Sequence, residues 1–249
     1  FGCARLSSLS IKDSAAIIEG CLENNILHFD TAPSYGTENL IGDILKGVKN
    51  TTIASKIGLP RQSPNNSLIR RIYKRSIKSL ANMAPLVKNK ISLRLNRIKA
   101  EHTNKRILSM DEIMYDLEKT LINLNKSKID ILLVHEPDQF LIDNDLVERF
   151  ENLKKQGLIE QYGLGYSQPS SEIIKFGNVR QFLYEDRSVK KNSFVNIVHG
   201  LIRASVLKGN KGAEHSQFIN DFILKNKNTS VLFSASKKCQ IQEICSNIY

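Results

Sequence analysis

The sequence has no apolar run of about 18 residues, so we expect no segment that spans a membrane. It has no basic-then-apolar signal sequence, although its first residue is not methionine. It also has only four cysteines, Cys3, Cys21, Cys239 and Cys245, whose spacing suits neither a metal site nor a disulfide scaffold. We therefore expect free, buried thiols, no metal, and a cytoplasmic protein.

The length suits one domain. Barrels of alternating strands and helices commonly fold as single units of about 250 residues, and this chain has 249. Its 41% hydrophobic content is ordinary for a globular protein and is sufficient for a core. We predict that residues 1–249 form a single domain.

The positive charge is concentrated in one segment. Residues 57–108 contain thirteen Lys or Arg and one acidic residue, Glu101, which gives +12, whereas the remaining residues sum to −1. We interpret 57–108 as a basic, lid-like insertion after the third strand. Its charge suits a solvated lid face, a pocket for an acidic or phosphorylated substrate, or contact with nucleic acid or anionic lipid. Tyr73 is the one aromatic residue among these basic residues, which is not the aromatic interleaving typical of nucleic-acid binding, so we expect no nucleic-acid partner.

Strand and helix patterns alternate along the whole chain, which predicts a parallel eight-stranded (β/α)8 TIM barrel. Residues 1–6 are predicted to be the end of the first strand. The other seven predicted strands cover 26–31, 51–55, 129–134, 161–166, 179–184, 194–198 and 230–234. The predicted helices cover 13–24, with Asp13 as N-cap, then 38–48, a segment opened by Ser109, 145–156, 170–176, 217–226 and 239–249.

Three ionisable residues follow buried strands at their carboxyl ends. Asp30, Lys56 and His135 end the second, third and fourth predicted strands, and neighbouring strands lie ~4.8 Å apart, so the side chains should meet. Tyr35, on the loop after Asp30, can fold over them. Each residue alone is more often structural, as a turn-former, a solvated lysine or a structural histidine.

Together these residues suit proton transfer to a carbonyl oxygen. A free phenol has a pKa of about 10, and a neighbouring cation such as Lys56 favours its ionised form. Asp30 would hold Lys56, while His135 would donate a hydrogen bond to the substrate oxygen.

Four stretches resemble the aldo-keto reductase family in sequence and in order. They are 29–36 (FDTAPSYG), 54–58 (ASKIG), 132–137 (LLVHEP) and 153–159 (LKKQGLI). The resemblance implies that Tyr35 is the general acid/base, assisted by Asp30, Lys56 and His135. It also implies hydride transfer between NADP(H) and a carbonyl or alcohol.

The resemblance extends to a cofactor site, with departures. It implies that Gln181 binds the nicotinamide carboxamide and Tyr184 stacks on the ring. It also implies that residues 201–207 form a loop in which Leu201 and Arg203 cover the pyrophosphate. Ser236, Lys237, Lys238 and Gln240 would bind the adenosine phosphate, which favours NADP(H) over NAD(H). Departures are Gly165 and Tyr166 where the family has a Ser-Asn pair, Ala204 where it has glycine, and Ile244 where it has an adenine-contacting asparagine.

We therefore predict an NADP-dependent aldo/keto reductase that acts on a sugar or another small carbonyl or alcohol, as a monomer or weak oligomer. The alternative is a catalytically weak nucleotide-binding barrel that serves as a regulatory or scaffolding subunit. A third possibility is a non-redox barrel enzyme that uses Asp30 and His135 for hydrolysis or isomerisation, but the sequence shows no nucleophile or metal cluster for such a reaction.

Overall fold

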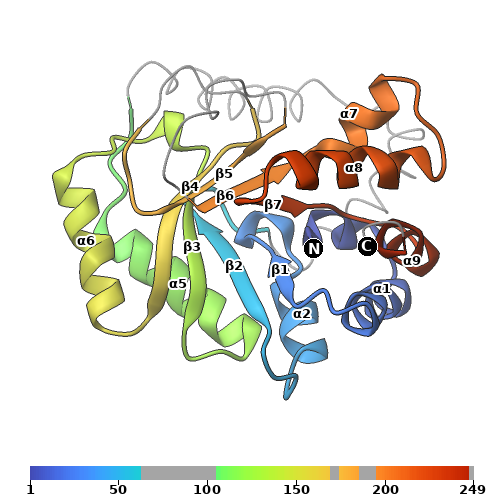
Figure 1. Cartoon of the computed structure of the whole chain (residues 1–249). Helices are drawn as coiled ribbons and strands as arrows, with labels where there is room; N and C mark the ends of the chain where they lie inside the picture. The colour runs from blue at the N-terminus through green and yellow to red at the C-terminus, as the bar shows by residue number, and fades with distance from the viewer. Residues whose placement is uncertain (63–104, 169–173, 185–194, 247–249) are drawn as a thin grey trace, which may run out of the picture.

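The computed structural model describes residues 1–62, 105–168, 174–184 and 195–246. Within them, parallel strands form one sheet in the chain order β1 to β7 (Figure 1). The strands are β1 (His28–Asp30), β2 (Thr52–Ile57), β3 (Ile129–His135), β4 (Ile159–Gly165), β5 (Val179–Leu183), β6 (Val195–His199) and β7 (Thr229–Leu232). The predicted (β/α) barrel is confirmed, with seven strands in the described residues instead of eight.

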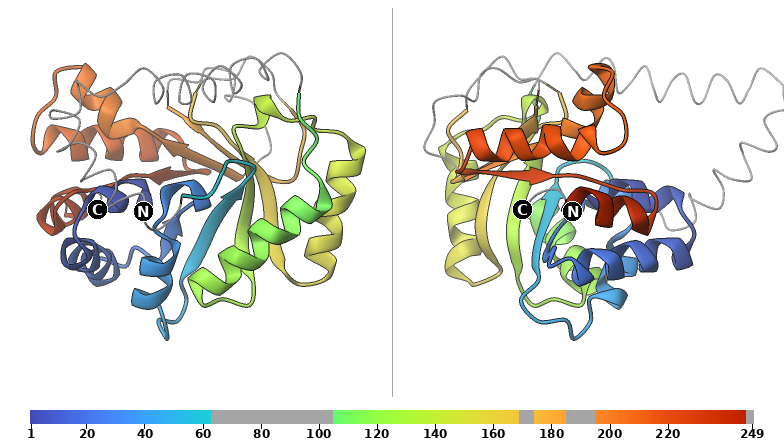
Figure 2. Two further views of the ribbon diagram at one scale, coloured as in Figure 1. Left: turned by 180° about the vertical axis from the view of Figure 1, so that it is seen from behind. Right: turned by 45° about the vertical axis from the view of Figure 1, so that its right-hand side comes forward.

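Helices surround this sheet, as the two further views in Figure 2 show. The α-helices are α1 (Ile11–Glu23), α2 (Glu38–Ile44), α5 (Met110–Leu124), α6 (Asn144–Lys155), α7 (Leu201–Leu207), α8 (Glu214–Lys225) and α9 (Lys238–Cys245). Short 3-10 helices are η1 (Cys3–Ser8), η2 (Pro33–Tyr35) and η4 (Pro137–Gln139). No helix in the described residues is long and apolar enough to cross a lipid bilayer.

Local sequence signals begin and end several of these helices. The Ser109 side chain accepts a hydrogen bond from the Glu112 amide at the start of α5, as the predicted capping box requires. Gly157 follows α6 with a φ of 74°, the left-handed conformation favoured after a helix end. The predicted cap at Asp13 is wrong by one turn, because Ser10 caps α1 and accepts from the Asp13 amide.

The predicted first strand is wrong, because residues 3–8 form η1. Gly2 and Phe1 bridge the two ends of the sheet: the Gly2 amide donates to the Phe233 carbonyl at 2.7 Å, and the Asp30 amide donates to the Phe1 carbonyl at 2.8 Å. In the described residues, Phe1 and Gly2 thus connect β7 to β1.

Other predictions are corrected or lie outside the described residues. Residues 201–207, interpreted from sequence as a loop over the pyrophosphate, form α7. Residues 174–176 are not helical, and the rest of the predicted helix 170–176 is outside the described residues. Most of the basic insertion 57–108 is outside them as well. All four cysteines are free, but only Cys3 and Cys21 are buried as predicted, whereas Cys245 is partly buried and Cys239 is exposed.

Candidate active site

The predicted catalytic side chains lie next to the apolar core of the barrel, at the carboxyl ends of the strands. The buried residues of that inner core are Ala54, Ile131, Leu133, Val179, Ile197 and Leu232. Side chains two positions apart on a strand point to the same face of the sheet. The next inward residues on β2, β3, β5 and β6 are therefore Lys56, His135, Gln181 and His199, and all four line one cavity of about 600 Å³.

Asp30 and Lys56 form a buried ion pair at the base of this cavity. The Lys56 Nζ lies 2.6 Å from Asp30 Oδ1 and 2.7 Å from Oδ2, and both residues are only 2% exposed. The ammonium also donates to the Thr31 carbonyl at 3.1 Å. Three acceptors thus fix the position of the Lys56 ammonium.

Tyr35 is placed above this pair by the turn η2. Pro33 begins the turn with a φ suited to a helix start, and Gly36 ends it with a φ of 68°. The Lys56 Nζ lies 5.2 Å from the centre of the Tyr35 ring, and the His135 ring meets that ring edge-on with a centroid distance of 6.0 Å. The structure thus brings together Asp30, Tyr35, Lys56 and His135, the group predicted from sequence.

Burial and charge set the protonation of these groups. Burial raises the pKa of Tyr35, and Lys56 opposes this change, so the phenol stays protonated at neutral pH. Burial also acts to lower the pKa of Lys56, but Asp30 and Tyr35 more than offset it and the net pKa is raised. Burial and the Lys56 charge lower the pKa of His135 to about 4, which keeps its imidazole neutral.

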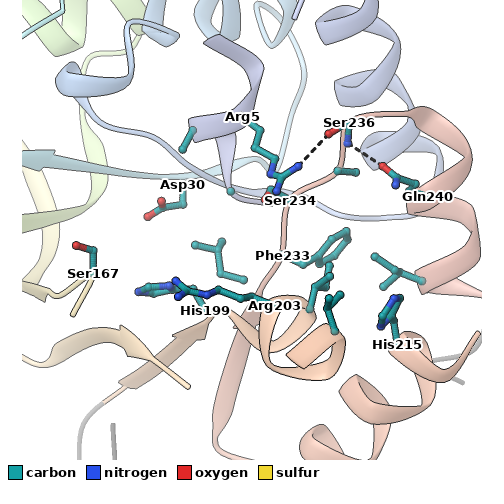
Figure 3. Close-up of a pocket in the computed structure, with 18 of the residues that line it drawn as sticks. Arg5, Asp30, Ser167, His199, Arg203, His215, Phe233, Ser234, Ser236 and Gln240 are labelled. Atoms are coloured by element: carbon teal, nitrogen blue, oxygen red, sulfur yellow. Dashed lines mark hydrogen bonds between the residues drawn. The ribbon is translucent and has the colours of Figure 1, made fainter. Parts of the chain in front are cut away.

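The cavity continues from these residues toward the start of α9 (Figure 3). Of the residues predicted to bind a cofactor, Gln181, Arg203, Ser236 and Gln240 line it. The Gln181 Oε1 is buried and has no hydrogen-bond partner among the described residues. Gln240 Oε1 already accepts from the Ser236 and Lys237 amides at 2.8 and 3.1 Å.

The other predicted cofactor residues lie elsewhere. Tyr184 packs edge-on against Phe218 and Phe222 of α8 and does not line the cavity. Leu201 is buried in the cluster that includes Phe182 and Ile219.

The two lysines at the start of α9 also lie outside the cavity lining. Lys237 is the exposed N-cap of α9. Lys238 reaches α1, where its Nζ forms an ion pair of 2.6 Å with Glu23. A phosphate-binding role for these two lysines stays a prediction.

Sequence reasoning missed several polar residues that line the cavity, among them Arg5, His199 and His215. Figure 3 shows Arg5 and Arg203 on opposite sides of the cavity, and Arg5 donates to the Ser236 hydroxyl at 3.2 Å. His199 ends β6 just as Asp30 and His135 end their strands, so the carboxyl-end rule would have found it. Arg5 had no such signal, because its segment was interpreted as a strand.

A parallel barrel with an ion pair, a phenol and an imidazole gathered at the carboxyl ends of its strands is the arrangement of a barrel enzyme. Residues 1–175 match the sequence pattern described as the aldo/keto reductase family. The chain therefore belongs to the aldo/keto reductase family.

Two curated proteins resemble parts of the chain. The uncharacterized oxidoreductase YcsN of Bacillus subtilis (strain 168) is 26% identical over 172 residues, which cover 66% of this chain and 47% of YcsN. The oxidoreductase YdhF of Escherichia coli (strain K12) is 30% identical over 64 residues, 26% of this chain and 22% of YdhF. The matches thus span less than half the length of either relative.

Solved structures share the fold at low sequence identity. The holo form of the aldo-keto reductase AKR11C1 from Bacillus halodurans is 18% identical, with a TM-score of 0.68, over 100% of this chain and 85% of that one. An aldo/keto reductase from Klebsiella pneumoniae, in complex with NADP and acetate, is 14% identical, with a TM-score of 0.60, over 100% and 84%.

Proposed function

We propose that the protein is an NADP(H)-dependent oxidoreductase that reduces an aldehyde or ketone to an alcohol, or catalyses the reverse reaction. The observation that carries this proposal is the buried Lys56–Asp30 pair beneath Tyr35, with neutral His135 beside it in the same cavity. Such a group transfers a proton to or from an oxygen atom and needs no nucleophile.

Each residue has a separate task in this proposal. The Tyr35 phenol holds the proton that it gives to the carbonyl oxygen, and Lys56 stabilises the phenolate that remains. Asp30 fixes the Lys56 ammonium through two short hydrogen bonds. The neutral His135 imidazole donates a hydrogen bond that orients the carbonyl oxygen and stabilises its developing charge.

The cavity suits a nicotinamide nucleotide, which when bound would supply or accept the hydride. The unpartnered Gln181 Oε1 fits the amide protons of the carboxamide, because a buried acceptor without a donor is costly. Arg5 adds positive charge beside Ser236, where the 2′-phosphate is proposed to bind, and Arg203 adds positive charge on the opposite side of the cavity. Support for NADP(H) over NAD(H) comes from the charge of Arg5 and from the NADP named in the Klebsiella pneumoniae complex.

The proposed substrate is a small carbonyl compound or alcohol, and we expect a monomer or weak oligomer without a nucleic-acid partner.

A nucleotide titration tests the cofactor half of the proposal. The chain has no tryptophan, so binding is best followed by the fluorescence of NADPH itself, with NADH as the comparison. We expect micromolar binding that favours NADPH. Equal binding of NADPH and NADH would refute the 2′-phosphate preference, and no binding would refute the cofactor assignment.

The variant Tyr35→Phe tests the catalytic half. Loss of a general acid/base lowers turnover by about 10²–10⁴-fold, so carbonyl reduction should fall by that factor while NADPH binding persists. The measurement is loss of nicotinamide absorbance with a panel of small aldehydes and ketones. Unchanged turnover in Tyr35→Phe would exclude the proposed mechanism.

The nucleotide-binding regulatory or scaffolding barrel remains the second candidate, because several predicted cofactor residues have other partners. Tyr184 packs on α8, Lys238 pairs with Glu23, and Gln240 caps α9. NADPH binding without turnover of any carbonyl in the wild-type protein would favour this candidate.

A further inference from the structure

Arg61 is the centre of a buried polar cluster that lies outside the catalytic cavity, between α2 and α5. Its Nη1 donates to Glu38 Oε2 at 2.6 Å, and its Nε donates to Asp116 Oδ1 at 3.1 Å. Its Nη2 donates to Thr120 Oγ1 at 2.7 Å and to the Asp116 carbonyl. The guanidinium thus joins the start of α2 to two turns of α5.

The cluster depends on Arg61 because it contains two buried carboxylates. Glu38 is 3% exposed and Asp116 is 8% exposed. Glu38 also accepts from the Thr120 hydroxyl at 2.8 Å and the Asn123 amide at 3.1 Å. Burial raises the pKa of Asp116, and Arg61 opposes this change. A buried polar network of this kind holds its geometry only while its members are satisfied.

Arg61 and its neighbour also hold the turn that carries Tyr35. The Gln62 amide donates to the Pro33 carbonyl at 3.0 Å, and Pro33 is the first residue of that turn. Glu38, held by Arg61, begins α2 three residues after Tyr35. The turn is therefore attached at its start through Gln62 and at its end through Glu38.

We infer that Arg61 is a positioning residue that holds the Tyr35 turn against Lys56 and His135. The inference rests on the proposed role of Tyr35 as acid/base. Arg61 touches no reacting group, and its effect passes through Glu38 and Gln62. Lysine retains the charge of arginine but not its planar set of donors, so it cannot reach Glu38, Asp116 and Thr120 together.

The test compares Arg61→Lys with the matched control Arg106→Lys. Arg106 also lies where the basic insertion meets the barrel: it pairs with Glu112 at 2.7 Å, donates to the Gly58 carbonyl at 3.1 Å and stacks on Phe140. These contacts include no residue of the Tyr35 turn. Both variants therefore weaken contacts between an end of the basic insertion and the barrel, but only Arg61→Lys removes contacts that are linked to the Tyr35 turn.

Two readouts separate positioning from general stability. In protein with ¹³C-labelled tyrosine rings, the Tyr35 signal is assigned by its loss in Tyr35→Phe, and the nearby His135 ring makes it sensitive to placement. In Arg61→Lys we expect this signal to shift or broaden, kcat to fall at least about tenfold, and the Kd for NADPH to stay within about twofold. In Arg106→Lys we expect the wild-type Tyr35 signal and kcat.

An unchanged Tyr35 signal and kcat in a folded Arg61→Lys protein would overturn the inference, even if Tm falls as it does in Arg106→Lys. If Arg61→Lys does not fold, Thr120→Val decides: with little change of volume it removes an acceptor of Arg61 and a donor to Glu38, the residue through which Arg61 reaches the turn at this end. An undisturbed Tyr35 signal there overturns the inference. If the wild-type protein reduces no carbonyl, the proposed function fails, and the Tyr35 signal alone still decides whether Arg61 positions the turn.

Discussion

At the scale of single residues, Asp30 and Lys56 depend on each other. Removal of one partner of a buried ion pair leaves an uncompensated charge and typically costs about 3–5 kcal/mol. We expect Lys56→Met to lower the free energy of unfolding in urea by that amount. The double variant Asp30→Asn/Lys56→Met, which leaves no buried charge, should recover most of the loss. A double variant as unstable as Lys56→Met would contradict this view of the pair.

His135 makes the stability depend on pH. The pKa of His135 is lowered from 6.5 to about 4 in the folded protein. Between these pH values the imidazole is therefore protonated in the unfolded chain but neutral in the folded protein. The free energy of unfolding should therefore fall as the pH drops through this window, by about 3 kcal/mol more in the wild type than in His135→Asn. The measurement is urea unfolding at several pH values.

The comparison of wild type with His135→Asn isolates this effect. Burial lowers the pKa of His28 to about 4 as well, but His28 is present in both proteins and cancels in the difference. Parallel acid profiles of the two proteins would refute the assignment to His135.

The convergence of the proposed catalytic residues could be predicted from sequence, whereas only half of the residues predicted to bind the cofactor line the cavity. Asp30, Lys56 and His135 each follow an apolar run, and the parallel sheet brings the ends of such runs together. Gln181 lines the cavity because it shares a face with buried Val179, while Tyr184 has the opposite parity and packs on α8. Which side chains of this strand face the cavity could be inferred only once the limits of β5 were known.

At the scale of elements, α2 and α5 pack closely at a glycine. A Cβ on Gly42 would lie 2.3 Å from the Asn123 carbonyl oxygen and 2.7 Å from the Cα of Leu124. We expect Gly42→Ala to lower the free energy of unfolding by about 1–3 kcal/mol, because the helices would have to separate. Asn39→Ala on the exposed side of α2 is the control and should change it by less than about 0.5 kcal/mol. Equal effects of the two substitutions would argue against close packing at Gly42.

The elements predicted correctly had both an apolar period and an end signal. Ser109, Glu112 and Gly157 supply such signals for α5 and α6. In contrast, α7 has no side-chain cap, and Gly200 before it has a φ of 85°, which suits a loop equally well. The first strand failed for a different reason: its apolar residues pack as a 3-10 helix after a single bridging residue.

At the scale of the whole molecule, a bound nucleotide should stabilise the entire barrel. The cavity is lined from β1, β2 and β3 as well as from β6, α7 and α9, so a ligand there bridges both halves of the chain. At a ligand concentration of 100 times Kd, the gain of about 2.7 kcal/mol corresponds to a rise in Tm of about 5–10 °C. Thermal scans with NADPH measure this rise, and NADH at the same concentration should give a smaller one.

A fluorescence titration that indicates NADPH binding without any rise in Tm would mean that the nucleotide binds the unfolded chain as well, and would contradict binding in the folded cavity.

In the part of the chain that the structure describes, Gly2 and Phe1 join β7 to β1 through three hydrogen bonds: the two amides described above and the Phe1 amino group, which donates to the His28 carbonyl. The other neighbouring strands are joined by ladders of several paired residues, such as β3 with β4. Local opening needs less free energy where fewer backbone bonds must break together. The amide protons of Gly2 and Asp30 should therefore exchange with deuterium sooner than those of β3, and each opening would expose the carboxylate that holds Lys56 to water.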